Sequence, residues 1–129
     1  CSVQVVTDDL FSTVWEATGV NATDDRDDVS FLNLLCKPQS LFDPRPLFWH
    51  YPHYYLNTTP VSAVRSGHHK LLHYYEDDRI ELYDLEADIS ESKNLAAVEP
   101  ERANELREML DGWIAAVGAA LPGPHPRGE

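Results

Sequence analysis

Basic residues are scarce in this sequence: ten Lys and Arg stand against 22 Asp and Glu, which gives a formal net charge of −12. This balance argues against nucleic-acid binding, because phosphate contacts need clustered Lys and Arg side chains. The sequence also lacks any run of about eighteen apolar residues, so we expect no membrane-spanning helix. Its two cysteines, Cys1 and Cys36, are too few for a disulfide framework.

The chain has enough apolar material for one domain with a hydrophobic core. Its length is 129 residues, and 43% of them are hydrophobic. The first residues show neither the basic start nor the apolar run of a signal peptide. Because the sequence begins with Cys1 instead of Met, we interpret it as a fragment or a processed piece.

A first helix is predicted near the N-terminus. Thr7-Asp8-Asp9 is a good N-cap cluster, and Leu10, Val14 and Ala17 then recur at helical spacing until Gly19 ends the helix. The spacing predicts that these apolar residues share one face of the helix.

Three strand-like runs follow between Pro46 and Leu85. The joints at Ser66-Gly67 and at Glu76-Asp77-Asp78 have the right length for antiparallel hairpins. Leu82 and Leu85 are expected to face the core.

A second helix is predicted to start at Pro100, a residue typical of the first helical position. Its apolar residues form one stripe at helical spacing, which we expect to pack on the strands: Ala103, Leu106, Leu110, Trp113, Ile114 and Val117. The fold class is therefore α+β. Residues 123–129 are rich in Pro and Gly and are predicted to be a disordered tail.

Several of these segments, taken in order, resemble the C-terminal part of a formylglycine-dependent sulfatase of the arylsulfatase type. The segments that carry the resemblance are Trp49-His50-Tyr51-Pro52-His53, the run Arg65-x-Gly67-x-x-Lys70-Leu71, Arg79 to Leu85, and Asp88, Glu91 and Asn94-Leu95-Ala96. Residues 10–19 look like the final helix of the large N-terminal α/β domain of that family, and residues 29–35 look like its linker.

The resemblance implies a division of the chain. Residues 1–28 would be the end of a truncated N-terminal α/β sulfatase domain, and residues 29–46 would be a linker. Residues 47–122 would be the C-terminal subdomain, a small antiparallel sheet of about four strands packed by the C-terminal amphipathic helix. Residues 123–129 would be the tail.

The resemblance also implies an activity for the parent enzyme. It would hydrolyse sulfate esters of a carbohydrate, with a formylglycine nucleophile and a calcium ion. Both groups would belong to the N-terminal catalytic domain, so this chain would carry no cofactor and no catalytic residue and would be inactive alone. The chain would support the fold and shape the cleft for a sulfated carbohydrate. Such enzymes are periplasmic, secreted or lysosomal.

Cys36-Lys37-Pro38-Gln39-Ser40 looks at first like the nucleophile motif of that family, Cys-x-Pro-x-Arg. The motif needs its arginine to hold the nucleophile and to offset anionic charge, and Ser40 stands at that position. We therefore interpret Cys36 as an ordinary loop cysteine.

The candidate substrate-binding residues are His50, His53 and Arg65. Imidazoles can donate hydrogen bonds or positive charge to an anionic ester, and Arg65 would reach the cleft. The alternatives are two structural histidines and ordinary hairpin packing of the arginine. His68, His69 and His73 could suggest a metal site, but no Cys or carboxylate stands at a recognisable spacing, so no metal ligand is predicted.

Two other functions stay open. The aromatic residues Trp49, Tyr51, Tyr54 and Tyr55 could be the sugar platform of a free-standing carbohydrate-binding or interaction module. The chain could also be a fragment without an independent role. An upstream reading frame that encodes Cys-x-Pro-x-Arg or Ser-x-Pro-x-Arg would favour the enzyme.

Overall fold

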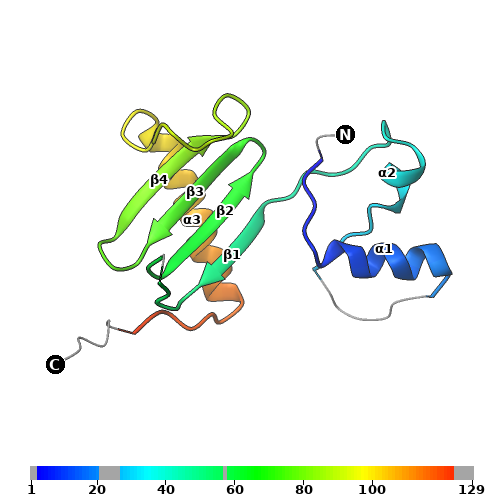
Figure 1. Cartoon of the computed structure of the whole chain (residues 1–129), viewed down its shortest axis with the longest axis horizontal. Helices are drawn as coiled ribbons and strands as arrows, with labels where there is room; N and C mark the ends of the chain where they lie inside the picture. Colours follow the sequence, from blue (N-terminus) through cyan, green and yellow to red (C-terminus); the bar gives the residue numbers. More distant parts are fainter. Residues whose placement is uncertain (1–2, 21–26, 57, 124–129) are drawn as a thin grey trace. The chain divides into compact units, whose positions relative to one another are not determined.

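The structure, a computed structural model, describes residues 3–20, 27–56 and 58–123. The chain divides into two compact units, Cys1–Pro44 and Arg45–Glu129 (Figure 1). Cys1 and most of the predicted tail, residues 124–129, lie outside the described residues. Among the described residues, no helix is both long enough and apolar enough to cross a membrane.

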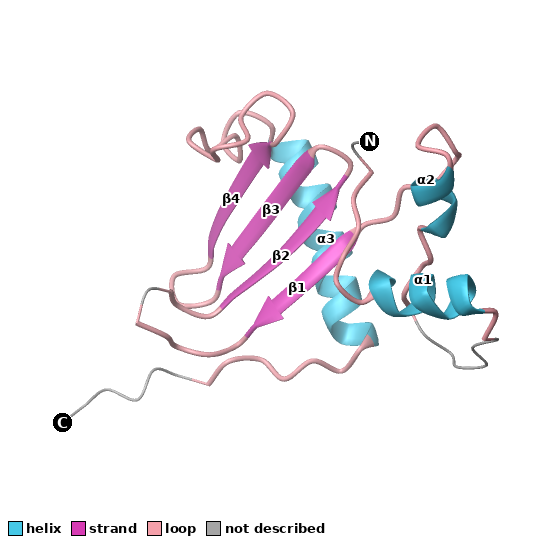
Figure 2. Ribbon diagram, turned by 45° about the vertical axis from the view of Figure 1, so that its right-hand side comes forward, coloured by secondary structure: helices cyan, strands magenta, loops and turns pink. Residues whose placement is uncertain are grey.

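The second unit is a four-stranded antiparallel sheet with one long helix. The strands are β1 (Leu47–Tyr51), β2 (Val61–Ser66), β3 (His69–Tyr74) and β4 (Arg79–Asp84), and they lie in the order β1-β2-β3-β4. Helix α3 (Pro100–Ala116) crosses one face of this sheet (Figures 1 and 2). The predicted α+β class and the small antiparallel sheet are thus confirmed.

Both predicted hairpins are present. The turn between β2 and β3 uses Gly67 at φ 62°, a left-handed conformation that glycine adopts without steric cost. The turn between β3 and β4 uses Asp78 at φ 55°, and Asp is one of the few other residues that tolerate this region.

The core of this unit lies between the sheet and α3. Cross-strand pairing aligns Phe48, Val64, Leu71 and Leu82 in one row, so their side chains share a face. Val64, Leu71 and Leu82 are fully buried there. The helix contributes its predicted stripe to the same cluster: Ala103, Leu106, Leu110 and Ile114.

Two residues of the predicted stripe are not fully buried in the core. Trp113 is only half-buried; its ring stacks on Phe48 with centroids 4.9 Å apart and planes at 3°. Val117 is 51% exposed because it follows the last helical residue as the C-cap, so its prediction as a core residue was wrong.

The loop after β4 is ordered by side chains that bond to the backbone. The Asp88 carboxylate accepts hydrogen bonds from the backbone N–H groups of Ser92 (2.8 Å) and Lys93 (2.9 Å). The Asn94 side-chain oxygen accepts the N–H of Leu82 at 3.0 Å. These bonds hold the loop against β4 and explain why an irregular segment has a defined shape.

The first unit contains α1 (Asp9–Thr18) and the short α2 (Leu32–Cys36). Helix α1 ends at Gly19 (φ 72°), as predicted. The N-cap prediction was wrong in detail, because the side chain of the N-cap residue Asp8 makes no capping bond. Instead the fully buried Asp9 accepts the backbone N–H groups of Val6 and Val29, both at 2.9 Å.

The apolar face predicted for α1 does not become a core in this structure. Leu10 and Val14 are 51% and 56% exposed, while Asp9 and Thr13 are the buried residues of the helix. Thr13 donates to the Asp9 carbonyl (2.7 Å) and accepts the N–H of Phe31 (3.0 Å). A polar network therefore joins α1 to the segment that leads into α2.

Candidate functional site

Strand β1 lies at the edge of the sheet and presents different residue types on its two faces. Trp49 and Tyr51 point away from α3 and are 45% and 39% exposed. His50 lies between them and points to the α3 side, in the row of Ser62 and His73. The alternation follows from the period of an extended strand.

His50 is held by hydrogen bonds at both ring nitrogens. Nδ1 lies 2.6 Å from the Ser62 hydroxyl, and Nε2 lies 2.9 Å from the carbonyl oxygen of Ala120. The imidazole thereby ties β1 to the segment that follows α3. This contact favours the structural role for His50, because neither nitrogen is left for a ligand in this arrangement.

His53 follows Pro52 just beyond the end of β1 and is exposed. Its ring meets the Tyr51 ring edge-on, with centroids 5.7 Å apart and planes at 89°. An exposed imidazole beside an aromatic wall has the freedom to approach a ligand that His50 lacks.

Arg65 lies on the face of β2 opposite α3, directly across from Lys70 on β3. Lys70 is paired: its Nζ lies 2.7 and 2.9 Å from the two carboxylate oxygens of Glu91. Arg65 donates only from Nε to the Gly67 carbonyl (3.3 Å) and has no carboxylate partner among the described residues. Arg65 is therefore the cation of this hairpin that remains available to an anion.

The three predicted residues are not brought together into one site. His50 lies on the α3 side of the sheet, whereas Arg65 lies on the other side. Arg65 pairs with Leu47 at the start of β1, while His53 lies past its end at Tyr51. Their roles in substrate binding stay predictions.

A hollow of about 520 Å³ lies at the end of the sheet where β1 ends and β2 begins. Its residues come from the β1–β2 connection and from the β3–β4 hairpin, and they are largely aromatic and hydroxylic: Tyr54, Tyr55, Leu56, Thr58, Thr59, Tyr74, Glu76 and Arg79. Tyrosine rings with hydroxyl and carboxylate groups around them suit the apolar faces and hydroxyl groups of a sugar.

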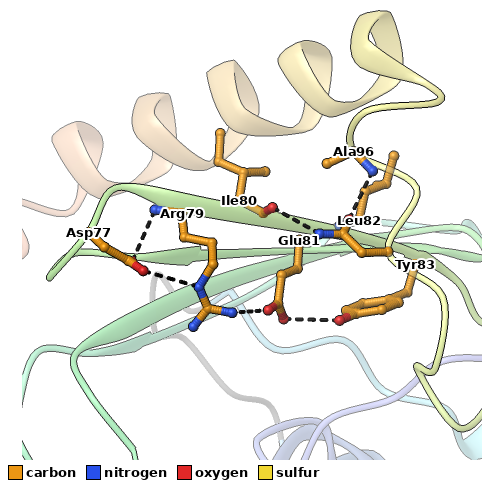
Figure 3. Close-up of polar contacts among 8 residues, drawn as sticks. Asp77, Arg79, Ile80, Glu81, Leu82, Tyr83 and Ala96 are labelled. Carbon is orange, nitrogen blue, oxygen red and sulfur yellow. Dashed lines mark hydrogen bonds and ion pairs between the residues drawn. The ribbon is translucent and has the colours of Figure 1, made fainter.

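The one cation in the wall of this hollow is already neutralised. Arg79 lies 4.0 Å above the centre of the Tyr74 ring and is paired with Asp77 (3.3 Å) and with Glu81. Figure 3 shows the contacts of Arg79 with Asp77 and Glu81 on the side of the sheet away from α3, where the Tyr83 hydroxyl also donates to Glu81. The hollow therefore suits a neutral part of a carbohydrate better than a sulfate group.

Tyr74 and Tyr83, which lie on this face, stay protonated over the physiological pH range. Burial and the hydrogen bond to Glu81 raise the pKa of Tyr83 to about 12. Burial and the charge of Glu81 also raise the pKa of Tyr74. Both hydroxyl groups therefore act as neutral hydrogen-bond donors.

The residues present do not fit the formylglycine nucleophile. Cys36 is the exposed last residue of α2, and the Ser40 hydroxyl donates a hydrogen bond to the carbonyl oxygen of Asn33 (3.3 Å). No arginine stands where the motif requires one. The residues do not fit calcium either, since the one ligand cluster found among the described residues is rich in imidazole, whereas Ca²⁺ prefers oxygen ligands.

That cluster consists of His68, His69 and Asp84. The sequence spacing did not indicate that Asp84 would lie beside the two histidines. His73, the third histidine considered there, lies at the opposite end of β3 and pairs with Asp78 at 2.7 Å. The predicted joint at Glu76-Asp77-Asp78 carries the signal that could have found Asp84, because the turn there sets the β3–β4 register that places His69 opposite Asp84.

The comparisons with known proteins agree on one family. The family described as "N-sulphoglucosamine sulphohydrolase, C-terminal" matches residues 2–117. Since this match covers most of the chain, the protein belongs to that family and corresponds to the C-terminal portion of a sulfatase. The resemblance read from the sequence is thus confirmed.

Individual relatives are sulfatases as well. A "Sulfatase" of Formosa agariphila is 29% identical over 127 residues, covering 86% of this chain and 23% of the relative. A "Delta 4,5-hexuronate-2-O-sulfatase" of Bacteroides thetaiotaomicron is 41% identical over 69 residues, covering 51% of this chain and 14% of the relative. The solved structure of a 2-O GAG sulfatase has a TM-score of 0.70 and 28% identity, with 85% of this chain and 24% of that chain covered. The chain therefore spans about a quarter or less of the length of these relatives.

Proposed function

We propose that this chain is the C-terminal part of a sulfatase that hydrolyses sulfate esters of a carbohydrate. The observation that carries the proposal is the match of residues 2–117 to a sulfatase C-terminal family. The substrate class to test first is a glycosaminoglycan unit with a 2-O-sulfated uronate, because a similar protein and a similar solved structure are both named as a 2-O-sulfatase.

The proposal divides the work between two parts of the enzyme. The nucleophile, derived from a Cys or Ser, and a calcium ion would be supplied by an N-terminal catalytic domain, since the described residues of this chain fit neither group. This chain would contribute fold support and one wall of the substrate cleft. A periplasmic, secreted or lysosomal location goes with this proposal.

The side chains proposed to contact substrate are those whose polar groups are not already used. Arg65 has a guanidinium without a carboxylate partner in the described part of the chain, and His53 is exposed beside Tyr51. His50 would act indirectly, by fixing β1 through Ser62 and Ala120. The tyrosine-lined hollow would take a neutral part of the sugar chain.

The test begins with the reading frame upstream of this chain, which should encode Cys-x-Pro-x-Arg or Ser-x-Pro-x-Arg. The protein that includes this motif should release sulfate from a 2-O-sulfated unsaturated uronate disaccharide. A frame without the motif, or a full-length protein without sulfate release from any sulfated glycosaminoglycan, would refute the proposal. Release only from another sulfate position would retain the sulfatase and refute the 2-O assignment.

Two variants of the full-length enzyme test the contribution of this chain. His53→Ala should weaken turnover of the sulfated disaccharide more than turnover of a small aryl sulfate, because His53 would recognise the sugar and not the sulfur. Lys70→Ala is the matched control, since it removes a cation that Glu91 already pairs. Equal losses on both substrates for His53→Ala would leave this histidine with a structural role.

A free-standing carbohydrate-binding module is the second candidate. It is favoured by one observation: Trp49, Tyr51 and Tyr55 are 45%, 39% and 66% exposed within a short segment. The 129-residue chain alone would then bind glycosaminoglycan oligosaccharides, and Tyr55→Ala would weaken that binding. Absence of binding by the isolated chain would exclude this candidate and leave the sulfatase proposal untouched.

A further inference from the structure

A cluster of metal-binding side chains lies at the β2–β3 turn, at the opposite end of β3 from His73. His68, His69 and Asp84 each offer one ligand atom, and these atoms all lie within 4.8 Å of one another. We propose that these three residues form a binding site for a divalent transition-metal ion of the zinc type. The proposal goes beyond sulfatase activity and does not depend on it.

The hairpin geometry explains how the three residues meet. His69 is the first residue of β3 and pairs in register with Asp84, the last residue of β4. The backbone N–H of Leu85 donates to the carbonyl oxygen of His68 at 2.8 Å, which fixes the turn against the end of β4. Residues from two segments of the chain are thereby held at one corner of the sheet.

The position of His68 in the turn is what lets two adjacent histidines act together. Neighbouring residues of a regular strand point to opposite faces. Here the chain turns at Gly67 (φ 62°), and the rings of His68 and His69 come to lie with centroids 4.2 Å apart. The two imidazoles thus lie on the same side of the turn, where both can bind one metal ion.

His69 is well suited to act as a metal ligand. Nδ1 of His69 is buried without a hydrogen-bond partner, and its side chain is only 14% exposed. A buried polar atom that lacks a partner is unfavourable, and a metal ion would satisfy it.

The carboxylate is also held in place. Oδ1 of Asp84 accepts the backbone N–H groups of Glu86 (3.0 Å) and Ala87 (3.4 Å). Hydrogen bonds of this kind orient a metal-binding carboxylate. They use Oδ1 and leave the second oxygen, Oδ2, for a cation.

Of the charged groups near the cluster, one favours the binding of a cation and another opposes it. Glu99 Oε2 lies 3.6 Å from His69 Nε2 and would favour a cation, or become a further ligand. Arg102 opposes a cation, although its charge is offset by Glu105 at 2.7 Å. Two imidazole nitrogens with one carboxylate oxygen form a donor set suited to Zn²⁺ and similar ions, and poorly suited to Ca²⁺.

The experiment is a titration of the metal-free 129-residue chain with zinc chloride, followed by calorimetry, and with cobalt chloride, followed by visible absorption. We expect a single ion per chain, a cobalt spectrum of low coordination number, and a higher melting temperature with zinc. His68→Gln and Asp84→Asn should each weaken zinc binding at least about tenfold. His68 is exposed and Asn keeps an oxygen for the two backbone N–H groups, so both variants should fold.

His53→Gln is the matched control, because it removes an exposed imidazole outside the cluster. It should leave zinc affinity unchanged. Zinc binding that is equal in all variants would place the ion elsewhere, for example on a cysteine thiol, and would overturn the proposal. Failure of the parent chain to bind zinc or cobalt at millimolar concentration would overturn it as well.

Discussion

Replacement of Leu106 by alanine is the most direct test of how the sheet and α3 hold together. Leu106 is fully buried and belongs to the cluster that includes Val64, Leu71 and Leu82. Its side chain lies between the helix and the sheet, so its removal leaves a space with packed atoms on all sides. We expect a large loss in the free energy of unfolding.

The magnitude follows from two contributions. Truncation of leucine to alanine removes about three carbon groups, each worth about 0.8 kcal/mol when buried. The transfer contribution is therefore about 2.4 kcal/mol. The cavity left behind adds to it, and buried Leu→Ala changes cost about 2–5 kcal/mol in total. Since strand and helix backbones on both sides limit collapse at Leu106, we expect about 3–4 kcal/mol.

The assay is equilibrium unfolding in urea, followed by circular dichroism, with the slope compared between variants. Leu56→Ala is the matched control: the chemical change is identical, but Leu56 is 94% exposed. That control should alter the free energy of unfolding by less than about 0.5 kcal/mol. Similar losses for both variants, or a loss below about 1 kcal/mol for Leu106→Ala, would refute the reasoning.

Three further predictions concern other parts of the chain. Trp113→Ala should cost less than Leu106→Ala, about 2 kcal/mol in the same assay, because Trp113 is half-buried and loses chiefly its stacking on Phe48. The hydrogen bond with His73 and the charge of Arg107 lower the pKa of Asp78 from 3.8, so its stabilisation is present above that value and is lost as the pH falls through the lowered pKa. Melting temperatures of Asp78→Asn and of the parent chain should therefore differ at pH 6 and converge toward pH 2. The isolated chain should show no turnover of an aryl sulfate with or without calcium, and a turnover that Cys36→Ala abolishes would contradict this.

Elements with a local cause could be predicted from the sequence. The two hairpins follow from Ser66-Gly67 and from Glu76 to Asp78, where glycine and aspartate supply positive φ angles at Gly67 and Asp78. Helix α3 begins at Pro100 because proline fits the first helical position, and its stripe repeats at helical spacing. In each case the residues that determine the structure lie within a few positions of one another.

The start of α1 could not be predicted in the same way. Asp8 and Asp9 both suit an N-cap by residue type, and the difference between them is made at a distance. Asp9 is buried because its carboxylate accepts the N–H of Val29, 20 residues along the chain. The pattern of Leu10 and Val14 predicted one apolar face, but periodicity does not say what will cover that face, and both residues are more than half exposed.

The same distinction between local causes and distant contacts applies to the candidate site. Alternation along β1 places His50 on the face opposite Trp49 and Tyr51. It could not show that Ala120, 70 residues away, would occupy the Nε2 atom of His50. The sequence thus located the segment but not which imidazole in it remains available.

The register of one hairpin decides which of its side chains can meet a ligand. Pairing of β2 with β3 sets Arg65 across from Lys70, and two cations so placed repel each other unless one is neutralised. Glu91, brought back by the loop after β4, neutralises Lys70 and leaves Arg65 for an anion. The next pairing, of β3 with β4, sets His69 across from Asp84. A shift of β2 by one residue against β3 would turn Arg65 toward α3, and a shift of β3 by one residue against β4 would separate His69 from Asp84. The first feature therefore depends on the turn at Gly67 and the second on the turn at Asp78.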